Sequence, residues 1–416
     1  MTETLETRSM QRDRGIRLRC SLAASAGFAL LIVGSNIPAP ILPIYRDDLQ
    51  LSTFTVTALF AVYLAALVAT FTTVARTTLA GKAAVVLPVS LGIGMIADVA
   101  LWAGHDAVAW LFAGRMLTGL AAGLGTGATA TIAVAMRGER GRAIAATGTL
   151  AGSFLGLVGA AVVAEFLPGP TTTVYLCHIA LVAIALGLLI VALVSARRVL
   201  KVELRGAAPS DATIDRDLGT LEVTGVPAVA VQDTRRLRWA GYGLGIAGWA
   251  IGGIVVGLLP TVVADELGSP SIIVTALAPI VLLGAACLSP YVFRSMRAEA
   301  AVVVIAVAAV LCLVGVWLGN LGLILTCCVL WGVGQGFAYA CGLRIVTAGL
   351  GPVDQGRVAS RYASICYGFT GVLAVTTGAV ATAWGSVGGM VLQAVVFVTL
   401  CTSVAVLGHR RWPAGV

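Results

Sequence analysis

The sequence predicts an all-α membrane protein in which twelve transmembrane helices form two parallel six-helix repeats. Three observations carry this prediction. Of the 416 residues, 59% are hydrophobic and only 11% are charged, against about 45–50% and about 25% in soluble domains. The apolar residues fall into segments of the length that crosses a bilayer core, about 20 residues. The lysines and arginines gather in alternate connecting segments.

Polar and turn-forming residues separate the apolar segments, and each segment is predicted to be a membrane-spanning helix. Spans one to six cover 19–44, 53–78, 83–104, 107–135, 143–166 and 173–196. Spans seven to twelve cover 239–262, 271–293, 299–318, 322–349, 357–384 and 387–408. The first apolar segment is too long for a cleaved signal peptide, so we expect it to remain as span one.

The longest polar segment, 197–238, is predicted to be a linker between an N-terminal bundle (19–196) and a C-terminal bundle (239–408), with polar tails at 1–18 and 409–416. If the N-terminus is cytoplasmic, all but three of the 27 lysines and arginines lie on or beside the cytoplasmic face. The exceptions are Arg46, Arg115 and Arg344. This asymmetry predicts a multi-pass inner (plasma) membrane protein with both termini cytoplasmic. It also explains the net charge of +8 without a nucleic-acid partner.

The two sets of six spans resemble each other. Gly141-Arg142, after span four, matches Gly356-Arg357, after span ten, at an offset of 215 residues. The same offset carries Gly119, in span four, onto a glycine of span ten. Parallel duplication of six-helix units is one way in which transporters are built.

Searches for catalytic and metal-binding patterns find none. The nine cysteines lie mostly within apolar segments and lack metal-ligand spacing, so we interpret them as small buried hydrophobic residues. The sequence contains no P-loop, HExxH or GxSxG motif. We therefore expect no enzymatic activity, no cofactor and no bound metal.

Several motifs resemble the major facilitator superfamily over nearly the whole chain. Span four carries the R-x-x-x-G-x-x-x-G pattern from Arg115 to Gly123. The segments 36–45 and 331–337, in spans one and ten, are similar to those of bacterial drug and metabolite exporters in that superfamily. The resemblance implies the major facilitator fold, efflux of a small molecule, proton entry as the driving force and alternating access between the two halves. We expect the protein to function as a monomer in the lipid bilayer.

Two family elements are altered. The loop after span two, 74–82, keeps a glycine and a basic residue but has no acidic residue. Span five keeps the glycines of the antiporter motif G-P-x-x-G-G but lacks its proline. Both changes bear on antiport more than on the fold.

Three polar side chains within spans are candidates for coupling or substrate binding. An arginine in hydrocarbon costs at least about 2.5–3.5 kcal/mol, so Arg115 should face a wet cavity or a partner. Asp98, in span three, is predicted to lie at a similar depth, where the two side chains could pair. Asn36 is the third candidate. The alternative for Arg115 and Asp98 is a purely structural role. We expect His178 to be a surface or packing residue and Glu165 to be interfacial.

Aromatic and amide side chains on spans two, seven, ten and eleven are candidates to line a mixed apolar pocket. The alternative is that they belong to the core or anchor span ends. The candidates are Tyr63, Trp249, Trp331, Gln335, Tyr339 and Tyr367.

Prolines and glycines define a further group with packing or hinge roles. Prolines remove backbone donors and predict a bend in the outer half of span one. Glycines at small-xxx-small spacing let helices approach closely. This group comprises Pro38, Pro40, Pro43, Gly119, Gly123, Gly152 and Gly156.

The sequence thus favours a secondary transporter that exports a small amphipathic molecule, a drug or metabolite, by proton antiport. One alternative is import of a nutrient or metabolite on the same fold. The other, less favoured, is a membrane protein that transports nothing, such as an embedded enzyme or sensor.

Overall fold

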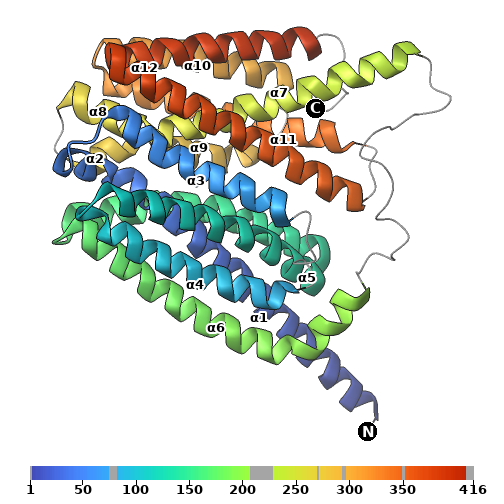
Figure 1. Ribbon diagram of the computed structural model, residues 1–416. Helices are drawn as coiled ribbons and strands as arrows, with labels where there is room; N and C mark the ends of the chain where they lie inside the picture. Colours follow the sequence, from blue (N-terminus) through green and yellow to red (C-terminus); the bar gives the residue numbers. More distant parts are fainter. Residues whose placement is uncertain are drawn as a thin grey trace.

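The protein is an all-helical membrane bundle, as predicted. The computed structural model describes residues 2–74, 82–206, 228–268, 271–292, 297–348 and 352–408, and these contain no strand. Figure 1 shows the helices running side by side, with α1 to α6 forming one half of the bundle and α7 to α12 the other. Among the residues that the structure describes, ten helices are long and apolar enough to cross a membrane.

The N-terminal half contains the first six predicted spans. Span one is α1 (Thr2–Asn36) followed by α2 (Pro38–Asp48), and span two is α3 (Thr53–Val74). Span three is α4 (Ala83–Trp102) with the short turn η2 (Ala103–His105). Spans four and five form one continuous assignment, α5 (Val108–Phe166), and span six is α6 (Pro170–Gly206). Gly138, with φ of 57°, breaks α5 between the two spans, a conformation that glycine adopts at no steric cost.

The C-terminal half contains the other six spans. Span seven is α7 (Ala228–Gly257) followed by α8 (Leu259–Leu267). Spans eight, nine and ten are α9 (Ile272–Val292), α10 (Ala298–Trp317) and α11 (Leu321–Thr347). The last helix, α12 (Pro352–Gly408), holds spans eleven and twelve, with a break at Trp384 and Gly385. Each predicted span therefore corresponds to a helical segment.

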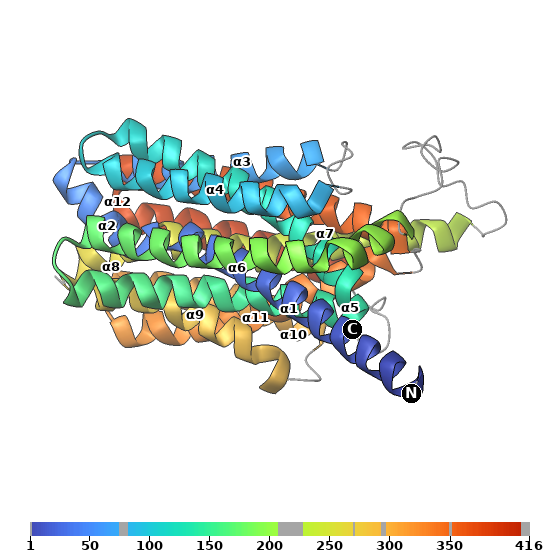
Figure 2. The ribbon, with the colours of Figure 1, turned by 90° about the horizontal axis from the view of Figure 1, so that it is seen from below.

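The two ends of the bundle differ in what they carry. We call the end where α6 finishes and α7 begins the linker end, and the opposite end, where α2 and α8 lie, the hairpin end. The start of α1 also lies at the linker end, where both α1 and the start of α7 project from the bundle (Figure 2). Helix extends into both sides of the predicted linker. Residues 207–227 of the linker, 75–81 of the loop after span two, and the tail 409–416 lie outside the described residues.

Apolar packing divides between the halves. One large buried cluster draws almost all of its members from α7 to α12, and two others are built from α1 to α6. Outward-facing positions are also apolar: Leu181, Ile184, Leu188 and Val191 recur at helical spacing on α6 and are 52–66% exposed. An exposed apolar face of this kind suits lipid and not water.

Candidate functional site

Polar contacts join the two halves at the hairpin end. Arg46 of α2 pairs with Asp265 of α8, with an N–O distance of 2.7 Å. Glu165, near the end of α5, accepts hydrogen bonds from the backbone N–H groups of Ile272 and Ile273, at 2.7 and 3.3 Å, and from the hydroxyl of Ser271 at 2.9 Å. The carboxylate of one half thereby caps the first turn of α9 in the other half. Glu165 was expected to lie at the membrane–water interface, and the structure shows in addition that it bonds across the two halves.

Three of the predicted pocket residues come together between the halves. The ring of Trp249, on α7, lies 4.9 Å from that of Tyr339, on α11, and 4.8 Å from that of Tyr367, on α12. The ring of Phe71, on α3, lies 6.1 Å from Tyr367 and adds a contact from the other half. We call these four residues the aromatic cluster. Trp249, Tyr339 and Tyr367 are only partly buried.

Arg115 lies in the N-terminal half, on the span-four part of α5. Its side chain is 6% exposed, and it donates to the carbonyl oxygens of Ser35 and Leu59, at 2.8 and 3.3 Å. Its guanidinium carbon lies 4.7 Å from the centre of the Tyr63 ring, a cation–π contact. At Gly119 a Cβ would overlap the carbonyl oxygen of Tyr63, so the glycine lets α5 approach α3 closely enough for these contacts.

A small cavity lies beside Arg115. Its lining includes Ser35 and Tyr45 from span one, Tyr175 from α6 and Val256 from α7. The volume of about 20 Å³ admits about one water molecule. Because helices of both halves contribute to the lining, the cavity reaches from their interface into the N-terminal half.

The predicted pair of Asp98 and Arg115 does not form. Asp98, on α4, instead contacts His178 of α6, with 2.7 Å between carboxylate Oδ2 and imidazole Nδ1. Both side chains are 3% exposed. The expectation that His178 is a surface or packing residue is therefore corrected. Counting residues from the span ends would have indicated this contact. His178 lies eight residues after Pro170, which begins its helix, and Asp98 lies eight residues before the loop residue Asp106, so the two are at similar depth.

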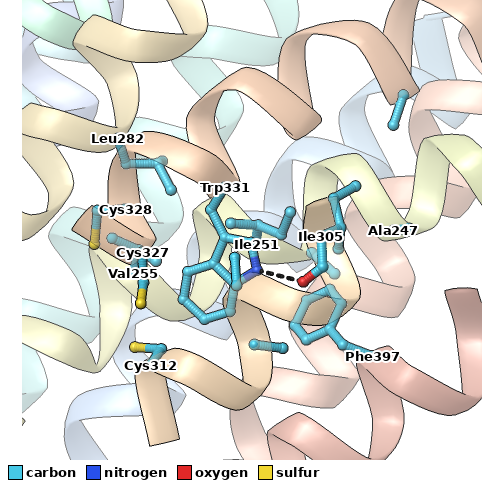
Figure 3. Close-up of a cluster of buried hydrophobic side chains, with 14 of the residues drawn as sticks. Ala247, Ile251, Val255, Leu282, Ile305, Cys312, Cys327, Cys328, Trp331 and Phe397 are labelled. Atoms are coloured by element: carbon cyan, nitrogen blue, oxygen red, sulfur yellow. Dashed lines mark hydrogen bonds between the residues drawn. The ribbon is translucent and has the colours of Figure 1, made fainter. Parts of the chain in front are cut away.

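The prediction that Trp331 lines a pocket is also wrong, because its side chain does not lie at the interface between the halves. It is fully buried in the core of the C-terminal half, where its indole N–H donates to the carbonyl of Ile305 at 3.1 Å and its ring lies 6.0 Å from that of Phe397 (Figure 3). Its neighbour Gln335, one turn further along α11, is 7% exposed and lies against Gly252 of α7. The side-chain oxygen of Gln335 is buried and has no hydrogen-bond partner among the described residues.

The helix of span one is interrupted at Ile37, between α1 and α2, where Ile37 keeps helical torsion angles (φ −50°, ψ −44°). Pro38 begins α2, and Pro43 lies within it. Asn36 donates to the carbonyl of Ile32 and to the hydroxyl of Ser35, both on its own helix. The amide therefore bonds locally and does not reach the carbonyls of α2.

Glycines bring α5 against α1 and α3. A Cβ at Gly123 would lie 2.6 Å from a carbon of Thr70, and at Gly156 it would lie 2.6 Å from the carbonyl oxygen of Val33. At Gly152 it would overlap the carbonyl oxygen of Ala29.

In the described part of the chain, no group of three histidine, cysteine, aspartate or glutamate residues is placed to hold a metal.

Two helical bundles, a partly buried aromatic cluster where they meet and a buried arginine within the N-terminal half are features of a polytopic membrane transporter. The chain belongs to the Major Facilitator Superfamily, whose family model matches residues 24–375. A search of curated proteins found no match.

Solved structures of transporters share the fold. A mutant of the nucleoside transporter NupG has a TM-score of 0.67 at 16% sequence identity, with 94% of this chain and 99% of that chain covered. A POT family transporter in complex with 5-aminolevulinic acid has a TM-score of 0.68 at 12% identity, covering 94% of this chain and 96% of the other. At these identities the likeness establishes the fold alone.

Proposed function

We propose that this chain exports a small amphipathic molecule, a drug or metabolite, by alternating access coupled to proton entry. The observation that carries the proposal is the aromatic cluster, which meets at the interface from α3, α7, α11 and α12. Aromatic faces suit an apolar or aromatic body, and Arg115 and Gln335 supply the few polar contacts that orient a ligand. The motif resemblance of spans one and ten to exporters supports the direction.

The predicted orientation fits this direction. If both termini are cytoplasmic, the hairpin end faces outward and the bonds of Arg46 and Glu165 close the outer side. The aromatic cluster then lies inward of that closure, where a substrate arrives from the cytoplasm. Cysteine labelling tests the orientation: a cysteine at Asp265 should react from outside and one at Arg235 from inside. The reverse pattern would overturn the orientation and the proposed direction with it.

Transport itself is tested by comparing a deletion strain with its parent against a panel of drugs and metabolites. Export predicts that the deletion strain accumulates the substrate, whereas import on the same fold predicts depletion. In everted vesicles, uphill transport should collapse with a protonophore and be indifferent to ATP analogues. Uphill transport without a proton gradient would exclude antiport.

The aromatic cluster gives a site-specific version of this test. Trp249→Ala removes the ring that contacts both Tyr339 and Tyr367, so binding and transport should fall sharply. Trp317, at the hairpin-end terminus of α10, is 71% exposed and is a matched control. Equal transport by the Trp249→Ala and Trp317→Ala variants would contradict the assignment of the site. We also propose that one chain suffices for transport and that the two bundles move as the predicted domains.

A further inference from the structure

The contact of Asp98 with His178 joins three helices of the N-terminal half. His178 Nδ1 lies 2.7 Å from Asp98 on α4, and Nε2 lies 2.9 Å from the carbonyl oxygen of Leu30 on α1. The ring sits directly over Gly34, where a Cβ would lie 2.5 Å from its Cε1. Both nitrogens of a buried imidazole are therefore engaged, and the glycine leaves the space that the ring needs.

The hydrogen bonds of His178 determine how many protons Asp98 and His178 hold together. A carbonyl oxygen can only accept, so Nε2 of His178 carries a hydrogen. The short contact between Nδ1 and the carboxylate holds a second one, either as imidazolium and carboxylate or as neutral imidazole and carboxylic acid. Either way Asp98 and His178 together are electrically neutral. They hold one proton more than a neutral histidine beside an ionised aspartate.

A route leads to this proton from the interface. Tyr175, three residues before His178 on α6, lines the small cavity together with Arg115, Val256 and Gly257. The Tyr175 hydroxyl is buried and has no hydrogen-bond partner among the described residues. The hydroxyl of Tyr45, which also lines the cavity, donates to the carbonyl of Leu101.

The groups that face the pair from neighbouring helices are few. Leu30 and Gly34 on α1 present only backbone. Tyr175 is the titratable neighbour on the pair's side of the cavity, and Tyr45 and Arg115 lie across it. A water molecule in the cavity would bridge the Tyr175 hydroxyl to the interface.

We propose that Asp98 and His178 form the proton-binding site of this protein, loaded from the interface through the cavity and Tyr175. The proposal rests on the proton coupling of the proposed function and names the residues that carry it. On release, one proton leaves the pair through the cavity to water and the pair gains a charge of −1. No covalent bond changes.

Proton release has a mechanical consequence. The single hydrogen left on the imidazole cannot serve both partners, so either the bond to Leu30 is lost or the Nδ1 lone pair faces the carboxylate. In the first case α6 loosens from α1, one to two turns before the break at Ile37, and in the second case α6 loosens from α4. Nearby, the Ser35 carbonyl accepts from Arg115, whose positive charge then faces a negative pair. Proton binding is thus linked to the packing of α6 against its neighbouring helices.

Proton binding is measured directly on the full-length protein with isotope-labelled histidine. The chain has three histidines, so replacing His105 and His409 with Gln leaves the His178 imidazole as the one signal. We expect both nitrogens to report the loaded state at low pH and one proton to be lost on raising the pH. Asp98→Asn should abolish the transition, because a buried imidazolium then has no counter-charge. Nitrogen signals of His178 that stay unchanged throughout the folded pH range would overturn the proposal, because release of the proton from either loaded form changes the hydrogen bond at Nδ1.

Coupling is measured in everted vesicles with a substrate identified by accumulation profiling. Asp98→Asn and His178→Gln should lose uphill transport but keep downhill exchange. The matched control is the exposed pair of His105 and Asp106, whose side chains lie 3.3 Å apart at the hairpin end. The His105→Gln and Asp106→Asn variants should keep both activities. Wild-type uphill transport in either Asp98→Asn or His178→Gln would overturn the coupling role.

Misfolding and failure of the proposed function give different results. If neither variant inserts, the histidine titration in the folded parent decides whether the pair binds a proton. If wild-type transport ignores a protonophore, antiport fails and the coupling role falls with it, even where His178 titrates. A purely structural pair would lower the thermal stability of both variants without changing the proton dependence of transport.

Discussion

The two halves of the bundle share one architecture but bury different chemistry. The N-terminal half encloses Arg115, Asp98 and His178 within its spans. The repeat offset of 215 residues places Leu330 where Arg115 lies and Gln393 where His178 lies. In the C-terminal half the buried side chains are mainly apolar, cysteine and aromatic, with Trp331 at the centre of the largest cluster.

This difference indicates that the two six-helix halves have different roles. A buried charge costs several kcal/mol unless it is paired or hydrogen-bonded, and Arg115, Asp98 and His178 each have polar partners within the N-terminal half. The other half contributes Trp249, Tyr339 and Tyr367 to the ligand surface. We interpret the N-terminal half as the one that handles charge and the C-terminal half as the one that holds the apolar body of the substrate.

The largest effect is expected at Arg115. Arg115→Ala leaves the carbonyls of Ser35 and Leu59 without their donor, and Arg115→Lys keeps the charge but loses the planar fork that spans both. Both variants should abolish most transport while the protein still inserts, as measured by vesicle uptake and by the amount in the membrane. Leu330→Ala, at the equivalent position of the other half, should not. Wild-type transport by the Arg115→Ala variant would contradict the charge-handling role that we assign to the N-terminal half.

The next largest effect is expected at Gly34, which leaves the space that the His178 ring occupies. Gly34→Ala forces the His178 ring away from α1, and crowding of this kind typically costs about 1–3 kcal/mol. Thermal unfolding of the purified protein should show a lower midpoint. Gly159→Ala is the control, because a Cβ there would meet nothing within 4 Å. Equal midpoints for the two variants would show that the ring can move without cost.

A smaller effect is expected where the halves meet at the hairpin end. Glu165→Gln replaces charge-assisted bonds to the start of α9 by neutral ones, which are roughly half as strong. The hairpin end should open more often, and a cysteine at Thr57, which packs against Gly378, should react faster with a water-soluble thiol reagent in a background without native cysteines. Arg46→Ala should act in the same direction more weakly, because partly exposed ion pairs contribute about 0–1 kcal/mol. Unchanged reactivity in Glu165→Gln would contradict its closing role.

The smallest effect is expected at Gln393. Its amide is 1% exposed, and neither of its polar atoms has a partner among the described residues. Gln393→Met keeps the volume and removes the unpaired groups, so stability should stay level or rise by about 1 kcal/mol. Thermal unfolding measures this. A clear loss of stability would mean that Gln393 makes a polar interaction equivalent to that of His178, which would make the halves more alike.

Much of the fold was predictable because the bilayer imposes a one-dimensional constraint. Twelve apolar segments of bilayer length, separated by polar residues, define the spans, and the prolines after Asn36 indicated where the helix of span one is interrupted, between α1 and α2. Their aromatic side chains within predicted spans also made Trp249, Tyr339 and Tyr367 candidates for the pocket. All of these signals act along the chain and need no knowledge of neighbouring helices.

The sequence did not predict which side chains meet across neighbouring helices. The sequence by itself determined that Asp98, Arg115 and His178 lie within spans at similar depth. It did not determine how each span is rotated about its axis, and rotation decides which of them meet. Close packing at Gly34 and Gly119 sets those rotations, so the tertiary structure alone assigned Asp98 to His178, Arg115 to the carbonyls of Ser35 and Leu59, and Trp331 to the core.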